Sequence, residues 1–181
     1  MSSQDRFNPL VERTEAKLRY AKVQLEHLKE YGGNGGTDFD RAFHESILFH
    51  LLGAKDAFLQ EINAYYKVGL APSGVTLGAL RQALMREGRQ SGELRELYEL
   101  ESNGDSWLSH AKQMRDYATH ISGVPRAFHM GGPNHGKVFL RNLSTLEHVE
   151  MHATDALAAW LENMRSLVAR FRESARSANA L

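Results

Sequence analysis

The chain has 181 residues, of which 42% are hydrophobic and 24% charged, which suits one globular domain with its own core. Its formal net charge is zero, so no overall basic field attracts nucleic acid, and such a contact needs a local patch. The lack of cysteine excludes disulfides, thiolate catalysis and cysteine-bound zinc. No apolar run could cross a membrane, and the start MSSQDRFNPL lacks a signal-peptide pattern, so we expect a cytoplasmic protein with no membrane partner.

Apolar residues recur at helical spacing through most of the chain, and capping residues mark where helices begin. Asn8 and Pro9 suit the start of a first helix, which Gly32 and Gly33 end before the loop GGNGGT. Four further segments show the same signals and are expected to be helical: Thr37 to about Tyr66, Thr76 to about Glu87, Glu93 to about Glu101, and Asp105 or Ser106 to about His120.

The segment from Ser122 to Gly136 differs from these helices because it is rich in glycine and proline. RAFHM and KVFLR flank GGPNHG, a pattern that predicts a glycine-rich loop or a small β-hairpin. After it, STLE from Ser144 to Glu147 matches a capping box, so we expect a last long helix from there to about Ser174.

Together these elements predict an all-α fold: an antiparallel helical bundle of about five helices, with the loop or hairpin before the last long helix. We expect one helical domain over residues 1–181, with 1–7 and 175–181 frayed. The sequence shows no internal repeat and no alternation of strands with helices that would indicate another architecture.

Metal chemistry has one candidate, His148 and His152, which would share one face of the last helix, with Asp155 three residues further on. A third ligand would have to come from the second helix, where the candidates are His44, Glu45 and His50. The alternative is that these residues are polar flanks of an amphipathic helix. We therefore expect no metal site and no cofactor, and keep the histidine pair as the weaker hypothesis.

Catalysis without a metal has a better candidate in the stretch MRDYATHISGVP, which holds Arg115, Asp116 and His120. Cleavage of an RNA phosphodiester needs a histidine to move protons near neutral pH and an arginine to hold the phosphate. Five residues on a straight helix place Arg115 and His120 about 140° apart. The helix must therefore loosen at Thr119 to Ser122, or the site must be shared across a dimer axis.

This stretch resembles the signature of HEPN domains, in which an arginine, a polar residue and then a histidine lie near a helix end. The resemblance implies an all-α bundle that commonly forms a homodimer. Active members are metal-independent endoribonucleases of toxin–antitoxin and other defence systems, whose motifs meet at the dimer interface. Inactive members serve as binding or dimerisation modules. The resemblance implies that Arg115 holds the phosphate, that His120 acts as acid or base, and that Asp116 orients a partner.

The glycine-rich segment behind this motif would supply a local positive patch for RNA. Its candidate substrate-binding residues are Arg126, His129, His135, Lys137, Arg141 and Asn142. A second arginine–histidine spacing, RNLSTLEH, begins at Arg141, but its histidine falls within the expected last helix. We rank this second match below the first.

Two hypotheses about function follow. The first is a homodimeric HEPN-like ribonuclease that binds RNA, with an antitoxin or other protein as a further partner. The second is a non-catalytic helical protein that binds a partner or dimerises, in which Arg115 pairs with a carboxylate and His120 lies at a helix C-terminus, where a cation is favoured. An open Arg115 and His120 near a symmetry axis would favour the enzyme, and a buried Arg115 paired with Asp or Glu would favour the binding module.

Overall fold

The computed structural model describes residues 3–32, 37–143, 145 and 147–178, and these form six α-helices and a small three-stranded antiparallel sheet. The all-α class is confirmed, and so is a hairpin before the last long helix. The three longest helices are α1 (Ser3–Tyr31), α2 (Asp38–Tyr65) and α6 (Ala153–Ala178). The shorter ones are α3 (Leu77–Arg86), α4 (Gly92–Ser102) and α5 (Trp107–His120), with a 3-10 turn, η1 (Pro72–Gly74), before α3.

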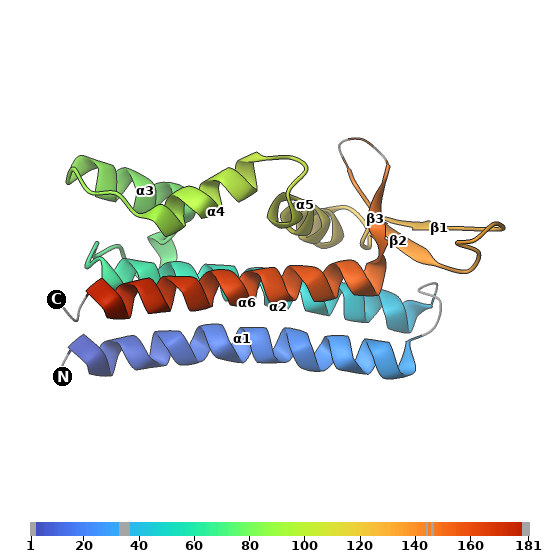
Figure 1. Ribbon diagram of the computed structural model, residues 1–181, viewed down its shortest axis with the longest axis horizontal. Coiled ribbons are helices and arrows are strands. Elements are labelled where there is room, and N and C mark those ends of the chain that lie inside the picture. The colour runs from blue at the N-terminus through green and yellow to red at the C-terminus, as the bar shows by residue number, and fades with distance from the viewer. Residues whose placement is uncertain (1–2, 33–36, 144, 146, 179–181) are drawn as a thin grey trace.

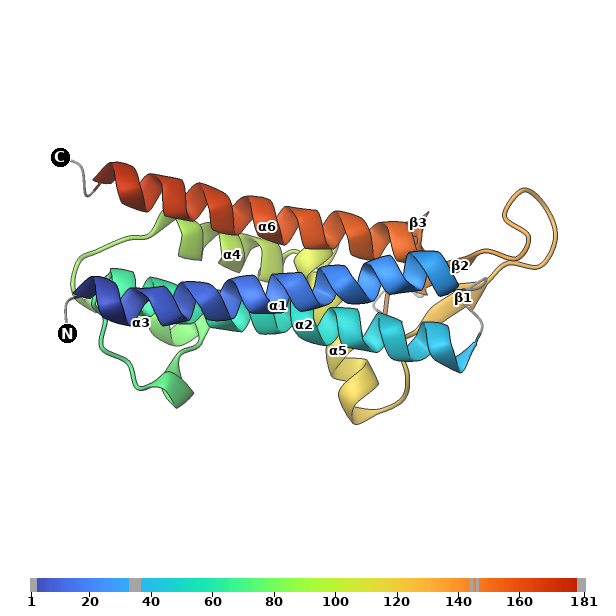
Figure 2. The same cartoon turned by 90° about the horizontal axis from the view of Figure 1, so that it is seen from below.

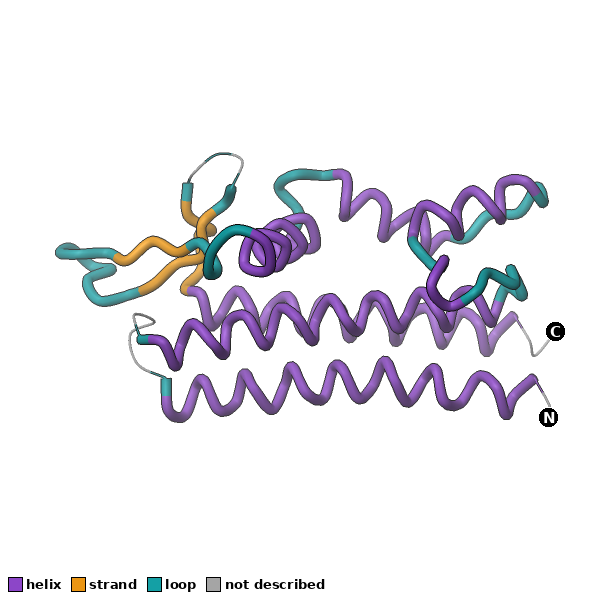
Figure 3. The backbone as a smooth tube through the Cα atoms, turned by 180° about the vertical axis from the view of Figure 1, so that it is seen from behind, coloured by secondary structure: helices purple, strands orange, loops and turns teal. Residues whose placement is uncertain are grey.

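The three long helices lie side by side, with α1 antiparallel to both α2 and α6, and both chain ends at the same end of the bundle (Figure 1). The shorter helices α3, α4 and α5 cover the side of α2 and α6 that faces away from α1. Unlike the long helices, α5 runs across the bundle, as the view from below shows (Figure 2). The end of α5 and the sheet lie near each other at one end of the molecule (Figure 3).

Local capping explains where the helices begin, as the sequence predicts. The Thr37 side chain accepts from the Asp40 backbone N–H, and the Asp40 carboxylate accepts in return from the Thr37 backbone N–H, a complete capping box. Hydroxyl groups of Thr76, Ser91 and Ser106 cap α3, α4 and α5 in the same way. The first helix differs from its prediction, because α1 begins at Ser3 and includes Pro9. Both α1 and α6 thus extend into the ranges for which fraying is predicted.

The predicted hairpin is formed by β1 (Arg126–Phe128) and β2 (Val138–Arg141), which pair antiparallel with Ala127 opposite Phe139. Its loop turns through Gly131, Gly132 and Gly136, whose φ angles are 86°, 68° and 78°. Side chains with a Cβ rarely adopt this left-handed region, which explains the cluster of glycines there. The hairpin projects beyond the end of the long helices (Figure 1).

The predicted start of the last helix is wrong. Residues His148–His152 form a third strand, β3, antiparallel to β2, and α6 begins only at Ala153. Ser144, the predicted cap, lies outside the described residues. The physical reason is that the backbone N–H and C=O groups of this segment bond to β2, a different part of the chain. Local helix-start signals carry no information about such a partner.

The hydrophobic core takes buried residues from all six helices and from β2. Between the long helices α2 and α6, Phe58 and Phe171 pack edge to face inside it with ring centroids 5.0 Å apart. One ion cluster crosses this layer. Arg172 of α6 forms two hydrogen bonds to the fully buried Glu61 of α2, of 3.0 and 2.9 Å, and also pairs with Glu15 of α1. This guanidinium fixes the side-by-side position of the three long helices.

Candidate functional site

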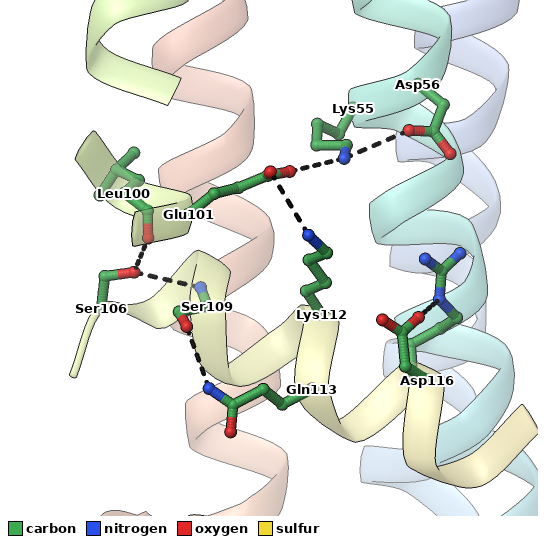
Figure 4. Close-up of polar contacts among 10 residues, drawn as sticks. Lys55, Asp56, Leu100, Glu101, Ser106, Ser109, Lys112, Gln113 and Asp116 are labelled. Carbon is green, nitrogen blue, oxygen red and sulfur yellow. Dashed lines mark hydrogen bonds and ion pairs between the residues drawn. The ribbon is translucent and has the colours of Figure 1, made fainter. Parts of the chain in front are cut away.

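The motif stretch lies at the C-terminal end of α5. Polar contacts in the first half of this helix set its position. Glu101 at the end of α4 binds Lys55 of α2 at 2.7 Å and Lys112 of α5 at 3.5 Å, so one carboxylate joins three helices (Figure 4). Lys55 also contacts Asp56 at 3.3 Å. The Ser106 cap and these ion pairs together hold α5 across the bundle.

The motif residues do not converge within one chain. Arg115 Nε donates to the Asp116 carboxylate at 2.7 Å, and the Arg115 side chain is 31% exposed. Of the range Thr119 to Ser122, where one alternative placed a loosening of the helix, residues up to His120 remain helical and the helix ends only after it. Arg115 and His120 therefore stay about 140° apart around the helix. His120 lies exposed in the last turn. The structure brings Arg115 to Asp116, but it does not bring either of them to His120.

A groove of about 550 Å³ opens between the end of α5 and the hairpin. Three of its lining residues are arginines from separate elements: Arg41 of α2, Arg126 of β1 and Arg141 at the end of β2. The other lining residues in the described part of the chain carry no ionised side chain: Tyr117, Ser122, Gly123, Val124, Pro125, Phe128 and Val138. We call this cavity the arginine groove. Several arginines along one groove are typical of anion recognition, and in this groove Arg41 also pairs with Asp38 at 3.6 Å.

Arg126 lies among charges of both signs. Burial lowers the pKa of Arg126, the positive charge of Arg41 lowers it further, and carboxylates of α2 act in the opposite direction. One of these carboxylates, Glu45, lies against the loop, since a Cβ added at Gly123 would be 3.2 Å from its Oε1 atom. Gly123 thus allows the loop after α5 to approach α2 closely and to close one side of the groove.

Beside Arg126, α2 presents a buried histidine. His44 is 1% exposed, and its Nδ1 atom has no hydrogen-bond partner among the described residues. Burial lowers the pKa of His44 to about 4, with Arg126 the next cause and Asp40 acting against it. His44 is therefore neutral near pH 7 and adds no charge to the site.

Of the six candidate substrate-binding residues, Arg126 and Arg141 line the arginine groove, while the others lie elsewhere. The His129 ring packs on Phe139 at 4.8 Å, and the His135 Nδ1 atom accepts from the Gly131 backbone at 2.7 Å. Lys137 lines a separate pocket of about 370 Å³ with His152. These three residues therefore belong to the hairpin loop and to a second pocket.

Asn142 is a structural residue. It is buried, and its side-chain nitrogen lies 3.0 Å from His110 Nε2 on α5, while its backbone N–H donates to Glu147. These bonds join the segment between β2 and β3 to α5. Its predicted role in substrate binding has no support from this position, because Asn142 does not line the groove.

The premise of the metal hypothesis is wrong, because His148 and His152 lie on a strand. Their Cα atoms are separated by four strand residues, roughly 13 Å, whereas neighbours on one helix face lie about 6 Å apart. Within the described part of the chain, no group of three His, Asp or Glu side chains could hold a metal ion. His50, one proposed third ligand, packs against Tyr20 of α1 instead.

Sequence reasoning missed two residues that line the groove, Arg41 and Tyr117. Tyr117 lies inside the motif stretch. Helical spacing alone could have placed it beside His120, about 60° around the same helix. Arg41 had no local signal, because only the fold brings the first turns of α2 to the hairpin.

No helix in the described residues is long and apolar enough to span a membrane. A family model described as a family of unknown function, DUF6586, matches residues 9–178. The chain belongs to this family. Neither the comparison with curated proteins nor the comparison with solved structures finds a match. For this DUF6586 member, the HEPN resemblance thus rests on the motif of α5 and on the helical architecture alone.

Proposed function

We propose that the protein binds single-stranded RNA through the arginine groove. The observation that carries this proposal is that Arg41, Arg126 and Arg141, from three separate elements, line one groove with no carboxylate among its described lining residues. Arginine suits this role because its planar guanidinium binds phosphate oxygens with two hydrogen bonds. In a chain with no net charge, the groove supplies the local patch that nucleic-acid binding requires.

Aromatic residues favour a single strand over a duplex. Phe128 is 53% exposed at the groove, and Tyr117 lines the opposite wall from α5. Proteins that bind single strands combine a positive groove with aromatic rings on which unpaired bases stack. The HEPN resemblance supports RNA as the nucleic acid. Because Arg115 does not line the groove, we place the phosphate contacts at the groove arginines and propose a binding module of the non-catalytic kind.

The test is fluorescence anisotropy with a labelled single-stranded RNA, comparing wild type with Arg126→Ala and with a variant that replaces all three groove arginines by alanine. One lost guanidinium–phosphate contact weakens binding about tenfold. We expect a larger loss in the triple variant and no change in Arg95→Ala, which removes an exposed arginine of α4 outside the groove. Equal affinity of the triple variant and the wild type would refute the proposal.

A second candidate is the homodimeric, metal-independent endoribonuclease. It is favoured by one observation: His120 is exposed in the last turn of α5, near the groove-lining Tyr117. In this candidate the Arg115 of one copy reaches the His120 of the other, because Arg115 and His120 of the same copy lie too far apart. Wild type would then cleave RNA in the presence of EDTA, and His120→Ala would bind RNA without cleaving it. RNA that stays intact with wild type at high protein concentration excludes this candidate while leaving the binding proposal standing.

A further inference from the structure

The side of α1 and α2 that faces away from the core carries a row of exposed apolar and aromatic side chains. We call it the α1–α2 face and define it by Tyr20, Val23, His27 and Tyr31 of α1 together with Phe39 and Phe49 of α2. The α1 members recur every three or four residues, so they share one side of the helix. Val23 and Phe49 are each 57% exposed, which is unusual for a set of large apolar residues so close together.

Ring contacts between α1 and α2 hold the aromatic side chains of this face against one another. His27 of α1 stacks on Phe43 of α2 with centroids 5.7 Å apart, and Phe43 packs on Phe39 at 4.4 Å. Further along, Tyr20 meets His50 edge to face at 5.4 Å. Such contacts reduce the freedom of the exposed rings, so less entropy is lost when they are covered by a partner.

The two ends of the α1–α2 face carry opposite charge. At one end Lys17 lies 4.8 Å from the centre of the Phe49 ring, with Arg13 one turn away. The pKa of Lys17 is lowered by burial and then by Arg13, and the pKa of His50 is lowered by burial and then by these two cations. No carboxylate is among the causes at this end. At the other end lie Glu30 and Asp38. The Asp38 side chain is 99% exposed and pairs with Arg41 of the same helix at 3.6 Å.

A surface with an apolar middle, one basic end and one acidic end is complementary to itself when a second copy is turned end for end. We propose that the α1–α2 face docks a second copy of this chain in a two-fold antiparallel arrangement centred near Val23. The rotation places the basic end of each copy against the acidic end of the other, twice by symmetry. The small side chains of Ala42 and Ser46 on α2 leave room for close approach of helices at the middle.

This inference goes beyond the proposed RNA binding and does not depend on it. The α1–α2 face contains no residue of α5, and α2 lies between α1 and α5 (Figure 1). The arrangement therefore differs from a dimer in which the Arg115 and His120 motifs of two copies meet in one site. The groove and this face share no described lining residue, but Asp38 of the face pairs with Arg41 of the groove at 3.6 Å. The two proposals are therefore separated by Val23→Arg, which leaves that pair in place and should weaken the dimer without changing RNA affinity.

The test is the mass of the full chain in solution, measured by analytical ultracentrifugation over a range of concentrations. We expect wild type to reach twice the chain mass, and Val23→Arg to weaken the dimer at least about tenfold, since it buries a charge at the centre. Asn163→Arg is the matched control, because it adds the same side chain on an exposed part of α6 outside the face. Circular dichroism checks that each variant keeps its helices.

Charge reversal then tests the antiparallel arrangement. Lys17→Glu with Arg13→Glu should weaken the dimer, and so should Glu30→Lys with Asp38→Lys. The four changes combined should restore it, because each reversed end again meets an end of opposite sign. A wild type that stays monomeric, or a dimer that tolerates Val23→Arg, overturns the inference. A combined variant no tighter than either parent overturns the antiparallel arrangement.

Discussion

Arg115 Nε donates to the carboxylate of Asp116 across 2.7 Å, so the two polar residues of the motif bind each other at the surface of α5. The pair keeps the guanidinium away from His120, which lies about 140° around the same helix. The motif is thus present in the sequence, while in one chain Arg115 lies outside the arginine groove, where we propose that phosphate binds.

Replacing either member of this pair should have small effects. Because both side chains are partly exposed, Arg115→Ala and Asp116→Ala should each lower the free energy of unfolding by at most about 1 kcal/mol. RNA affinity should stay within about twofold of wild type, since Arg115 does not line the groove. Urea denaturation and anisotropy measure these two quantities. Loss of RNA binding in Arg115→Ala as large as that in Arg126→Ala would show that Arg115 contacts the ligand.

Protonation of His44 should destabilise the fold in acid. Its pKa is about 4 in the folded protein and about 6.5 when unfolded, so the unfolded chain binds more protons between these values. Neutral His44 therefore makes its full contribution to the free energy of unfolding above pH 6.5. This contribution is lost as the pH falls towards 4. The shift corresponds to about 3 kcal/mol.

The check is urea denaturation of wild type and of His44→Gln at pH 7, 6 and 5. Burial lowers the pKa values of His50 and His110 too, so some loss of stability in acid remains in the variant. The difference between the two proteins isolates His44. An identical pH dependence in both would contradict this account of the buried ring.

The Arg172–Glu61 pair should be essential to stability. Arg172→Met leaves the fully buried Glu61 carboxylate without its bidentate partner, and the free energy of unfolding should fall by about 3–5 kcal/mol. The matched control is Arg170→Met, which removes an arginine of the same helix that pairs with Glu96 at the surface, and should cost at most about 1 kcal/mol. Similar losses in the two variants, measured by denaturation, would contradict a structural role for the buried pair.

Helical spacing and capping residues predicted most of the fold because they act within a few residues of sequence. The capping box at Thr37, the ends of α5 and the hairpin around GGPNHG all depend on such local chemistry. The strand at His148–His152 was missed because its stability comes from pairing with β2, far from its own local pattern. A helix-start signal cannot reveal a partner strand.

The candidate site was predicted in part for the same reason. Arg126 and Arg141 were identified because they flank the glycine-rich hairpin, which has a strong local signature. Arg41 could not be found, since its closeness to Arg126 depends on the packing of α2 against the sheet. Helical spacing predicted that Arg115 and His120 lie apart on a straight helix, and the continuous helix of α5 keeps them apart. A site shared across a dimer axis, the other alternative, stays a prediction.

The central claim is that three groove arginines hold phosphates of a single strand. The salt dependence of RNA binding tests it most directly, because each neutralised phosphate contributes about −0.7 to the slope of log affinity against log salt concentration. With three contacts we predict a slope of about −2 for wild type, falling towards zero when Arg41, Arg126 and Arg141 are all replaced by alanine. A slope that is the same in both proteins would contradict the claim.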